Sequence, residues 1–157
     1  MTVLVWRIGI DTPNYGADDL SGEGPRRTGG RWNRPGTPMI YTSSSVALAC
    51  LETIVHLVAG DLPLNRYLVS VEIPDDVWKT ATALETRDHV GWDAIPAGIT
   101  SLQAGNRWVT AGTSALLLAP SVIVPEENNI LINPAHPAAT GIRAKKLRRW
   151  TYDARLR

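Results

Sequence analysis

The sequence predicts an α+β fold, in which a mixed β-sheet forms the core and helices flank it. Residues 3–8 are rich in β-forming side chains, and residues 67–73 alternate between apolar and polar positions, as a strand with one buried face does. Between them, apolar residues recur at helical spacing over residues 46–58. Strand and helix patterns that follow one another in this way are typical of a sheet covered by helices.

The composition predicts one folded domain over residues 1–157. Of the 157 residues, 44% are hydrophobic and 20% are charged, and the formal net charge is +1, so disorder is excluded as the main state. The apolar runs are too short to span a bilayer of roughly 30 Å, and the N-terminus carries no export signal. A lone Cys50 and three histidines without metal-ligand spacing predict no metal site. We therefore expect a cytoplasmic protein with no membrane span.

The first elements are a strand, a long loop and a second strand. Residues 3–8 form the first predicted strand, which Gly9 ends. Residues 11–38 are rich in glycine and proline and predict a loop, and a loop of this length in a compact domain is more often functional than idle. Residues 39–41 predict a short strand after it.

A helix and another strand follow. Serines 43–45 supply hydroxyl groups that can cap a helix, and the apolar spacing predicts that this helix spans residues 46–58 before Gly60. Residues 67–73 predict a strand that ends at Pro74.

The second half of the chain predicts one helix and two strands. Residues 75–97 read as irregular. Residues 99–111 favour a helix, although Gly105 weakens the pattern. Residues 115–124 and 129–132 predict strands separated by a turn.

The C-terminal segment is the basic part of the chain. Residues 141–157 carry seven basic side chains and one acidic side chain. These basic residues could form a phosphate-binding patch, but side chains alternate over residues 149–156 as in a strand with one charged, exposed face, and we favour the strand. The patch would comprise Arg143, Lys145, Lys146, Arg148 and Arg149.

The densest functional signal is the motif Thr28-Gly29-Gly30-Arg31-Trp32-Asn33. Its two glycines permit close approach of the backbone, and the Arg31 guanidinium is a rigid fork of donors that suits a pair of phosphates. The motif could therefore bind an anionic ligand. The alternative is a surface turn with Arg31 in an ordinary salt bridge.

Glu52 stands in an otherwise apolar helical stretch, where an ionised carboxylate must find a partner. His56 lies one turn later, so the alternative is a Glu–His pair at a solvated edge. Tyr41 ends the strand before this helix, and its ring could converge with the Glu52 carboxylate or pack as a core tyrosine.

Two further sites contain polar residues next to proline. Ser121 follows Pro120 in an apolar run, but no Gly-x-Ser-x-Gly motif supports a serine hydrolase. Asn133 and His136 stand in a predicted rigid turn and are expected to hold backbone groups.

Taken in order along nearly the whole chain, these motifs resemble the RES-domain family. The family is named for an Arg, a Glu and a Ser, which correspond here to Arg31, Glu52 and Ser121, and Tyr41 corresponds likewise. The motifs are Trp6-Arg7, Gly29-Gly30-Arg31-Trp32-Asn33, Tyr41, Ala49-Cys50-Leu51-Glu52, Pro120-Ser121, Asn129-Ile130-Leu131-Ile132-Asn133-Pro134 and His136-Pro137.

The resemblance implies a fold similar to that of ADP-ribosyltransferases and the role of a toxin in a bacterial toxin–antitoxin pair, with an Xre-type antitoxin as partner. It implies an enzyme that cleaves the nicotinamide–ribose bond of NAD+ or transfers ADP-ribose to a protein. NAD+ would be the substrate, and no cofactor is expected. The resemblance does not decide whether water, phosphate or a protein side chain accepts the ADP-ribose.

The resemblance also suggests a role for each site residue. Glu52 would stabilise the oxocarbenium-like state, and Arg31 would hold the pyrophosphate. Tyr41 would stack on the nicotinamide, Ser121 would orient the substrate, and Arg7 would be a further phosphate contact.

Two alternatives come from other functional classes. The basic C-terminal segment, six tryptophans and three histidines are compatible with an RNA-binding or RNA-cleaving toxin, although direct nucleic-acid binding is not expected except through the antitoxin. The long loop is compatible with a non-enzymatic module that binds a partner protein.

Overall fold

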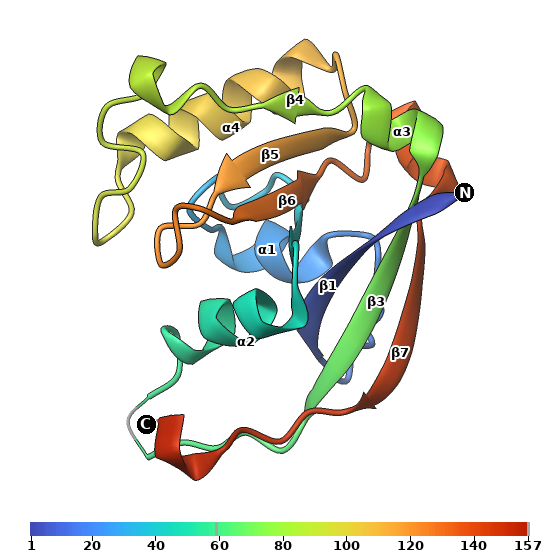
Figure 1. The fold of residues 1–157 in the computed structure, drawn as a ribbon, viewed down its shortest axis with the longest axis vertical. Helices are drawn as coiled ribbons and strands as arrows, with labels where there is room; N and C mark the ends of the chain where they lie inside the picture. The colour runs from blue at the N-terminus through green and yellow to red at the C-terminus, as the bar shows by residue number, and fades with distance from the viewer. Residues whose placement is uncertain (59, 157) are drawn as a thin grey trace.

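Seven strands form one mixed sheet in the computed structural model, which describes residues 1–58 and 60–156 (Figure 1). The strands are β1 (Thr2–Ile10), β2 (Ile40–Ser43), β3 (Arg66–Pro74), β4 (Thr82–Ala83), β5 (Leu116–Pro120), β6 (Asn128–Ile132) and β7 (Arg143–Arg149). Their order across the sheet is β4-β5-β6-β2-β1-β3-β7. The β4–β5 pair is parallel and the other pairs are antiparallel, which confirms the predicted α+β class with a mixed sheet.

The helices match the predictions in part. They are α1 (Glu23–Thr28), α2 (Val46–Ile54), α3 (Asp75–Lys79) and α4 (Ile99–Ala111), with 3-10 turns at Thr86–Asp88, Pro137–Gly141 and Ala154–Leu156. Ser45 caps α2 as expected, since its hydroxyl accepts a hydrogen bond from the Leu48 N–H at 3.1 Å. However, α2 ends four residues earlier than predicted. Short elements also occupy two segments for which none was predicted: α1 lies in the predicted loop, and α3 and β4 lie in the segment predicted to be irregular.

The predicted C-terminal strand is wrong in position. The strand is the basic run itself, β7, which pairs with β3 at the edge of the sheet. On an exposed edge strand, side chains reach water on either face, so basic residues are tolerated at successive positions. Tyr152 leaves the sheet and is buried against Ala49 and Cys50 of α2. Arg157, which ends the basic segment, lies outside the described residues.

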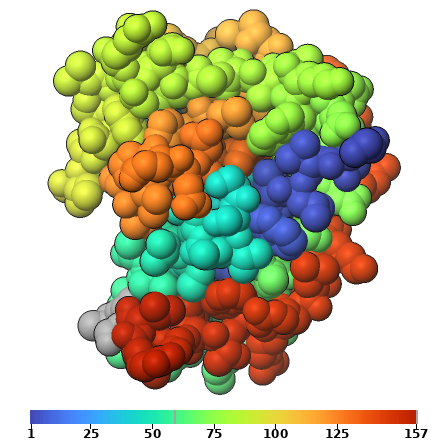
Figure 2. Space-filling model, in the orientation of Figure 1, coloured from blue at the N-terminus to red at the C-terminus, as the bar shows by residue number. Residues whose placement is uncertain are grey.

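The two faces of the sheet carry different layers. On what we call the first face, Val5, Ile40 and Ile132 belong to one apolar cluster. On the second face, Trp108 of α4 packs against the β5–β6 half of the sheet, and α2 packs against the β1–β3 half, where Ile8 lies. In the strand order, β2 lies between these two halves of the sheet. A space-filling view shows α2 between the segment that joins β5 to β6 and the C-terminal segment (Figure 2).

Gly105 allows α4 to approach the loop that precedes β2. A Cβ atom added at Gly105 would lie 1.9 Å from the Trp32 carbonyl oxygen, well inside van der Waals contact. The glycine that weakens the helical pattern in the sequence is therefore required by packing.

We expect Gly105→Ala to destabilise the fold, although alanine favours a helix by about 1 kcal/mol over glycine. Relieving the overlap with Trp32 should cost about 1–3 kcal/mol or more, measured as the free energy of unfolding in urea. Gly98→Ala is the matched control, because its added Cβ would meet only the Ala94 Cβ at 3.8 Å. Equal stability of both variants and the unmodified protein would contradict the requirement for a glycine at position 105.

Within residues 1–58 and 60–156, no helix has the length and the apolar character that crossing a membrane requires.

Candidate functional site

Glu52, Ser121 and Asn129 meet on the second face of the sheet. Glu52 comes from α2, Ser121 directly follows β5, and Asn129 belongs to β6. The Ser121 hydroxyl donates to Glu52 Oε1 at 2.6 Å, and Asn129 Nδ2 donates to the same oxygen at 2.8 Å. The alternative of a Glu52–His56 pair is therefore not what the structure contains: His56 is exposed, and the carboxylate has other partners.

The hydrogen-bonding capacity of the Ser121 hydroxyl is fully used. Ser121 is buried, and its oxygen accepts hydrogen bonds from the Ile123 and Val124 N–H groups, both at 3.1 Å. A hydroxyl has one proton and two lone pairs, so its proton goes to Glu52 and both lone pairs are occupied. With these hydrogen bonds, Ser121 holds the Glu52 carboxylate. A role of Ser121 in orienting a substrate stays a prediction.

Tyr41 anchors the glycine-rich motif to β2. Its hydroxyl donates to Asn33 Oδ1 at 2.5 Å and accepts from the Trp32 N–H at 3.1 Å. Burial raises the pKa of Tyr41 above its ordinary value, so the phenol stays neutral. A Cβ at Gly30 would lie 2.6 Å from the Tyr41 hydroxyl oxygen, which explains the glycine at that position.

Arg31 is held by backbone carbonyls. Its Nη1 donates to the carbonyl oxygens of Trp92 at 3.0 Å and Ala94 at 2.9 Å, and the Trp92 ring stacks on Trp32. Among the described residues no salt bridge involves Arg31, so the alternative of an ordinary ion pair is not observed. The positive charge is fixed in place but is not neutralised by a carboxylate, which leaves it able to attract an anion.

Arg7 lies on the opposite face of the sheet from Glu52, Ser121 and Asn129. Its neighbours Trp6 and Ile8 pack beneath α2 on the second face, so the alternation of β1 directs Arg7 to the first face. There Nη1 donates to the Asp19 carbonyl oxygen at 3.0 Å. Burial lowers the pKa of Arg7, while the negative charge of Asp19 opposes that shift. The structure does not bring Arg7 to Glu52, and a phosphate contact by Arg7 stays a prediction.

Two asparagines hold the candidate site together and were not predicted as site residues. Asn129 donates to Glu52, and Asn33 is buried, with Nδ2 donating to the carbonyl oxygens of Pro25 and Thr37, both at 2.9 Å. The signal that could have found them is an amide side chain adjoining buried apolar residues, where it must have partners.

The predicted turn at Asn133 and His136 is confirmed. Asn133 Oδ1 accepts from the Ala135 N–H, and His136 Nδ1 accepts from the Ala138 N–H, both at 3.1 Å. Both side chains hold backbone groups, as expected.

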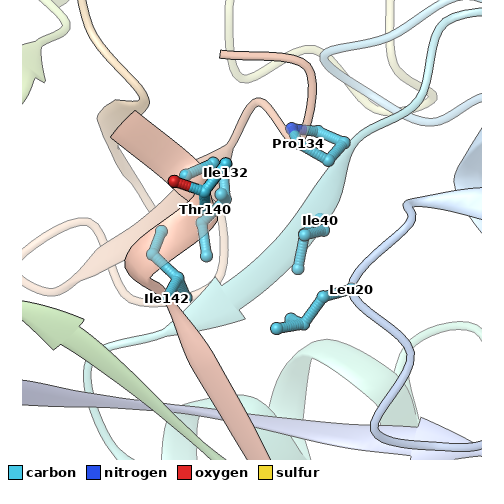
Figure 3. Close-up of a pocket in the computed structure, with 7 residues that line it drawn as sticks. Leu20, Ile40, Ile132, Pro134, Thr140 and Ile142 are labelled. Atoms are coloured by element: carbon cyan, nitrogen blue, oxygen red, sulfur yellow. The ribbon is translucent and has the colours of Figure 1, made fainter. Parts of the chain in front are cut away.

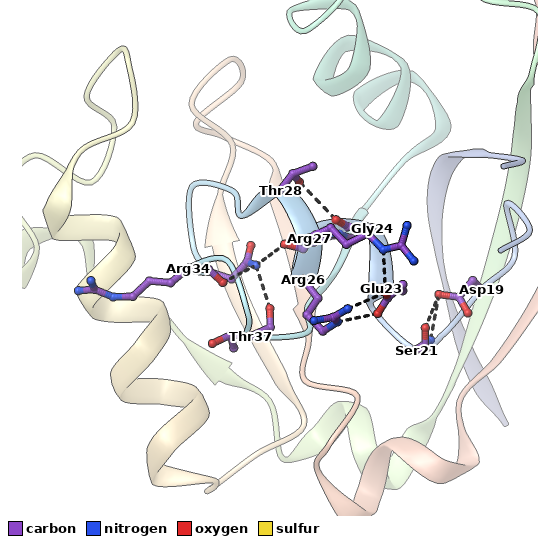
Figure 4. A network of polar contacts seen from close by, with 11 residues as sticks. Asp19, Ser21, Glu23, Gly24, Arg26, Arg27, Thr28, Arg34 and Thr37 are labelled. Atoms are coloured by element: carbon purple, nitrogen blue, oxygen red, sulfur yellow. Dashed lines mark hydrogen bonds and ion pairs between the residues drawn. The ribbon is translucent and has the colours of Figure 1, made fainter. Parts of the chain in front are cut away.

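A charged network stabilises α1 inside the predicted loop (Figure 4). Glu23 accepts hydrogen bonds from Arg26 Nε at 2.6 Å, Arg26 Nη2 at 2.7 Å and Arg27 Nε at 2.8 Å. The hydrogen bonds from Arg26 and Arg27 lower the pKa of Glu23 to about 2. This helix lies just before the glycine-rich motif, and its Pro25 carbonyl accepts hydrogen bonds from the Gly29 N–H and from Asn33 Nδ2.

The Glu23 network should make stability depend on acid. Because the pKa of Glu23 is about 2 in the folded protein and about 4.5 when unpaired, the contribution is complete above about pH 4.5 and is lost as the pH falls towards 2. We expect Glu23→Gln to lower Tm slightly at pH 7, since the pair is partly exposed, and the difference from the unmodified protein to vanish near pH 2. Glu126→Gln, at an exposed position, is the control. A difference in Tm that persists near pH 2 would contradict this role.

Two hollows lie outside the site formed by Glu52, Ser121 and Asn129. One of about 250 Å³, on the first face, is lined mainly by apolar side chains (Figure 3). The other, of about 300 Å³, lies between β4 and α4. Within the described residues, no three His, Cys, Asp or Glu side chains are grouped so that they could hold a metal ion.

The chain is similar to known toxins over nearly its whole length. The RES domain family model matches residues 4–155. A protein of Sphingobium sp. (strain YBL2) named Prs ADP-ribosylating toxin is 57% identical over 157 residues, which cover 99% of this chain and 98% of that protein. A protein of Yersinia enterocolitica named Toxin Res is 36% identical over 145 residues, covering 91% of this chain and 93% of that protein.

The fold is also found in a solved structure. The crystal structure of the M. tuberculosis MbcT–MbcA toxin–antitoxin complex contains a chain that matches with a TM-score of 0.60 at 19% identity, covering 99% of this chain and 87% of that chain. At this identity the likeness concerns the fold. The family match and the curated relatives show that the chain belongs to the RES-domain family and is an enzyme of that family's toxin type.

Proposed function

We propose that this toxin breaks the nicotinamide–ribose bond of NAD+ and that Glu52 is the catalytic carboxylate. The observation that carries the proposal is the way Glu52 is held. Two donors, from Ser121 and Asn129, both bind Oε1, so Oε2 is the carboxylate oxygen that they leave open to a ligand. A carboxylate fixed through one oxygen presents the other in a defined direction.

The chemistry requires a negative charge at a set position. Loss of nicotinamide leaves positive charge on the ribose ring, in an oxocarbenium-like state, and a preorganised carboxylate stabilises that charge as it develops. Glu52 would also accept a hydrogen bond from a ribose hydroxyl. Nicotinamide leaves with the electron pair of the broken bond, so its ring becomes neutral.

Arg31 and Tyr41 would bind the remainder of NAD+. Within residues 1–58 and 60–156, no carboxylate pairs with the Arg31 guanidinium, and Nη1 is the group that bonds to the carbonyls of Trp92 and Ala94. Its other N–H groups would donate to the pyrophosphate. Tyr41, held through its hydroxyl by Asn33, would present its ring to the cationic nicotinamide, a contact worth about 0.5–2 kcal/mol.

The second candidate is transfer of ADP-ribose to a protein, and a specific observation favours it. The relative at 57% identity is named an ADP-ribosylating toxin, and that name gives Prs as its target. Transfer to a protein and cleavage by water or phosphate begin with the same broken bond. They differ only in which nucleophile then reaches the ribose, so the role of Glu52 is common to all of them.

An antitoxin partner is also part of the proposal. The solved structural neighbour is a toxin–antitoxin complex, which supports a partner of that kind here, and we expect an Xre-type antitoxin. A segment of the antitoxin that reached Arg31 would compete with the pyrophosphate. NAD+ turnover unchanged in the purified complex would contradict this blocking geometry.

The test is nicotinamide release from NAD+ by the purified protein, with water alone, with phosphate and with a cell lysate as acceptor. We expect nicotinamide release in at least one of these conditions. Labelled NAD+ shows whether ADP-ribose becomes attached to a protein. RNA cleavage or salt-dependent RNA binding without nicotinamide release would favour the RNA-acting alternative instead.

A further inference from the structure

The Asn129 side chain lies between Glu52 and a buried serine. Its Nδ2 donates to Glu52 Oε1 at 2.8 Å, and its Oδ1 accepts from the Ser43 hydroxyl at 2.8 Å. Ser43 in β2 and Asn129 in β6 face each other directly across the two strands. The sheet register itself therefore sets the distance between the two side chains.

The hydrogen bonds run from Ser43 to Asn129 and from Asn129 to Glu52, and this direction has a physical reason. An amide donates at one end and accepts at the other. The reversed amide would place its oxygen against the Glu52 carboxylate, where two acceptors would face each other. With Ser43 donating to Oδ1, the N–H group is directed at Glu52, and the buried serine hydroxyl also has its partner.

We propose that Asn129, oriented by Ser43, is a positioning residue that holds Glu52 Oε1 so that Oε2 faces the reacting ribose. The inference rests on the proposed function of Glu52. Asn129 acts through Glu52 and has no contact with substrate of its own. Removing it should therefore slow the chemical step while leaving NAD+ binding almost unchanged.

The first test uses two substitutions at Asn129. Asn129→Ala should lower kcat for nicotinamide release about 10- to 100-fold with KM for NAD+ within about twofold, because a misplaced catalytic group loses rate rather than affinity. Asn129→Asp keeps the shape but sets a second carboxylate against Glu52, so kcat should fall further. If Asn129→Ala misfolds, Asn129→Asp still tests the inference, because its side chain has the same size.

The matched controls lie one residue away. Asn128 is exposed on the same strand, and the alternation of β6 directs its side chain to the other face. Asn128→Ala and Asn128→Asp make the same chemical changes and should leave kcat within about twofold. Thermal unfolding of all four variants checks that they are folded.

Ser43 supplies the second test. Ser43→Ala should lower kcat less than Asn129→Ala does, because the amide remains and only its orientation is released. If Ser43 acts through Asn129, the double variant Ser43→Ala/Asn129→Ala should have the kcat of Asn129→Ala alone. If the losses in kcat of the two single variants multiply in the double variant, Ser43 does not act through Asn129.

Growth inhibition on induction of each variant in cells separates this inference from the proposed function. Unmodified protein that inhibits growth but releases no nicotinamide would overturn the proposed function, whereas the growth assay would still compare the Asn129 variants. We expect Asn129→Ala and Asn129→Asp to inhibit growth less than the Asn128 variants do. Asn129 variants that retain full kcat and full growth inhibition, while Glu52→Gln loses both, would overturn the positioning role.

Discussion

Glu52→Gln should abolish nicotinamide release while leaving the fold intact. Both donors to Glu52 bind Oε1, so a glutamine can keep both hydrogen bonds through its carbonyl oxygen and place its NH₂ group where Oε2 was. The substitution then removes the negative charge and the open acceptor without removing a partner from Ser121 or Asn129. Loss of such preorganised stabilisation typically costs about 10²- to 10³-fold in rate, and we expect at least this loss in kcat.

The measurement is nicotinamide release by Glu52→Gln beside Glu126→Gln. Glu126 is exposed between β5 and β6, so its substitution should leave kcat unchanged. Thermal unfolding of Glu52→Gln should match that of the unmodified protein, because the hydrogen bonds are kept. Turnover by Glu52→Gln within tenfold of the unmodified rate would remove Glu52 from the chemistry.

The second large effect is expected at Arg31. Arg31→Ala should raise KM for NAD+ by about 10- to 100-fold or more, because each hydrogen bond to a charged group contributes about 1.5–3 kcal/mol. Arg31→Lys should recover only part of this loss, since an ammonium group cannot reproduce the planar fork of donors. Arg34→Ala, at an exposed position three residues later, is the control.

Binding of ADP-ribose isolates this contribution from the chemistry. ADP-ribose retains the pyrophosphate and lacks the bond that is broken, so calorimetry should show its affinity weakened in Arg31→Ala and unchanged in Glu126→Gln. Equal affinity of Arg31→Ala and the unmodified protein would mean that the pyrophosphate lies elsewhere. Arg31 would then act by holding the carbonyls of Trp92 and Ala94.

The main elements of the fold were readable from local sequence because their signals are local. The serines before α2 and the alternation of β3 each depend on residues that are neighbours in the chain. The helix α4 was found at its observed bounds despite Gly105. The reason for that glycine could not be read, because the contact that requires it is with Trp32, far along the chain.

The C-terminal strand was misplaced for a similar reason. Side-chain alternation over residues 149–156 looks like a strand, but tertiary packing of Tyr152 beneath α2 removes that segment from the sheet. The strand forms instead where β3 offers backbone partners, over Arg143–Arg149.

The candidate site was predicted only in part. An acidic residue in an apolar helix requires a partner, and Glu52 has two, but the local sequence pattern favours neither of them over His56. Ser121 is 69 positions away, and the folded sheet alone brings them together. The face on which Arg7 lies depends on which face α2 covers, which no local pattern specifies.

The most direct test of NAD+ cleavage is nicotinamide release by the purified protein, followed beside Glu52→Gln in water, in phosphate and in cell lysate with labelled NAD+. We expect release by the unmodified protein in at least one of these conditions and none by Glu52→Gln. Absence of release in all three, with no label transferred to any protein, would contradict it.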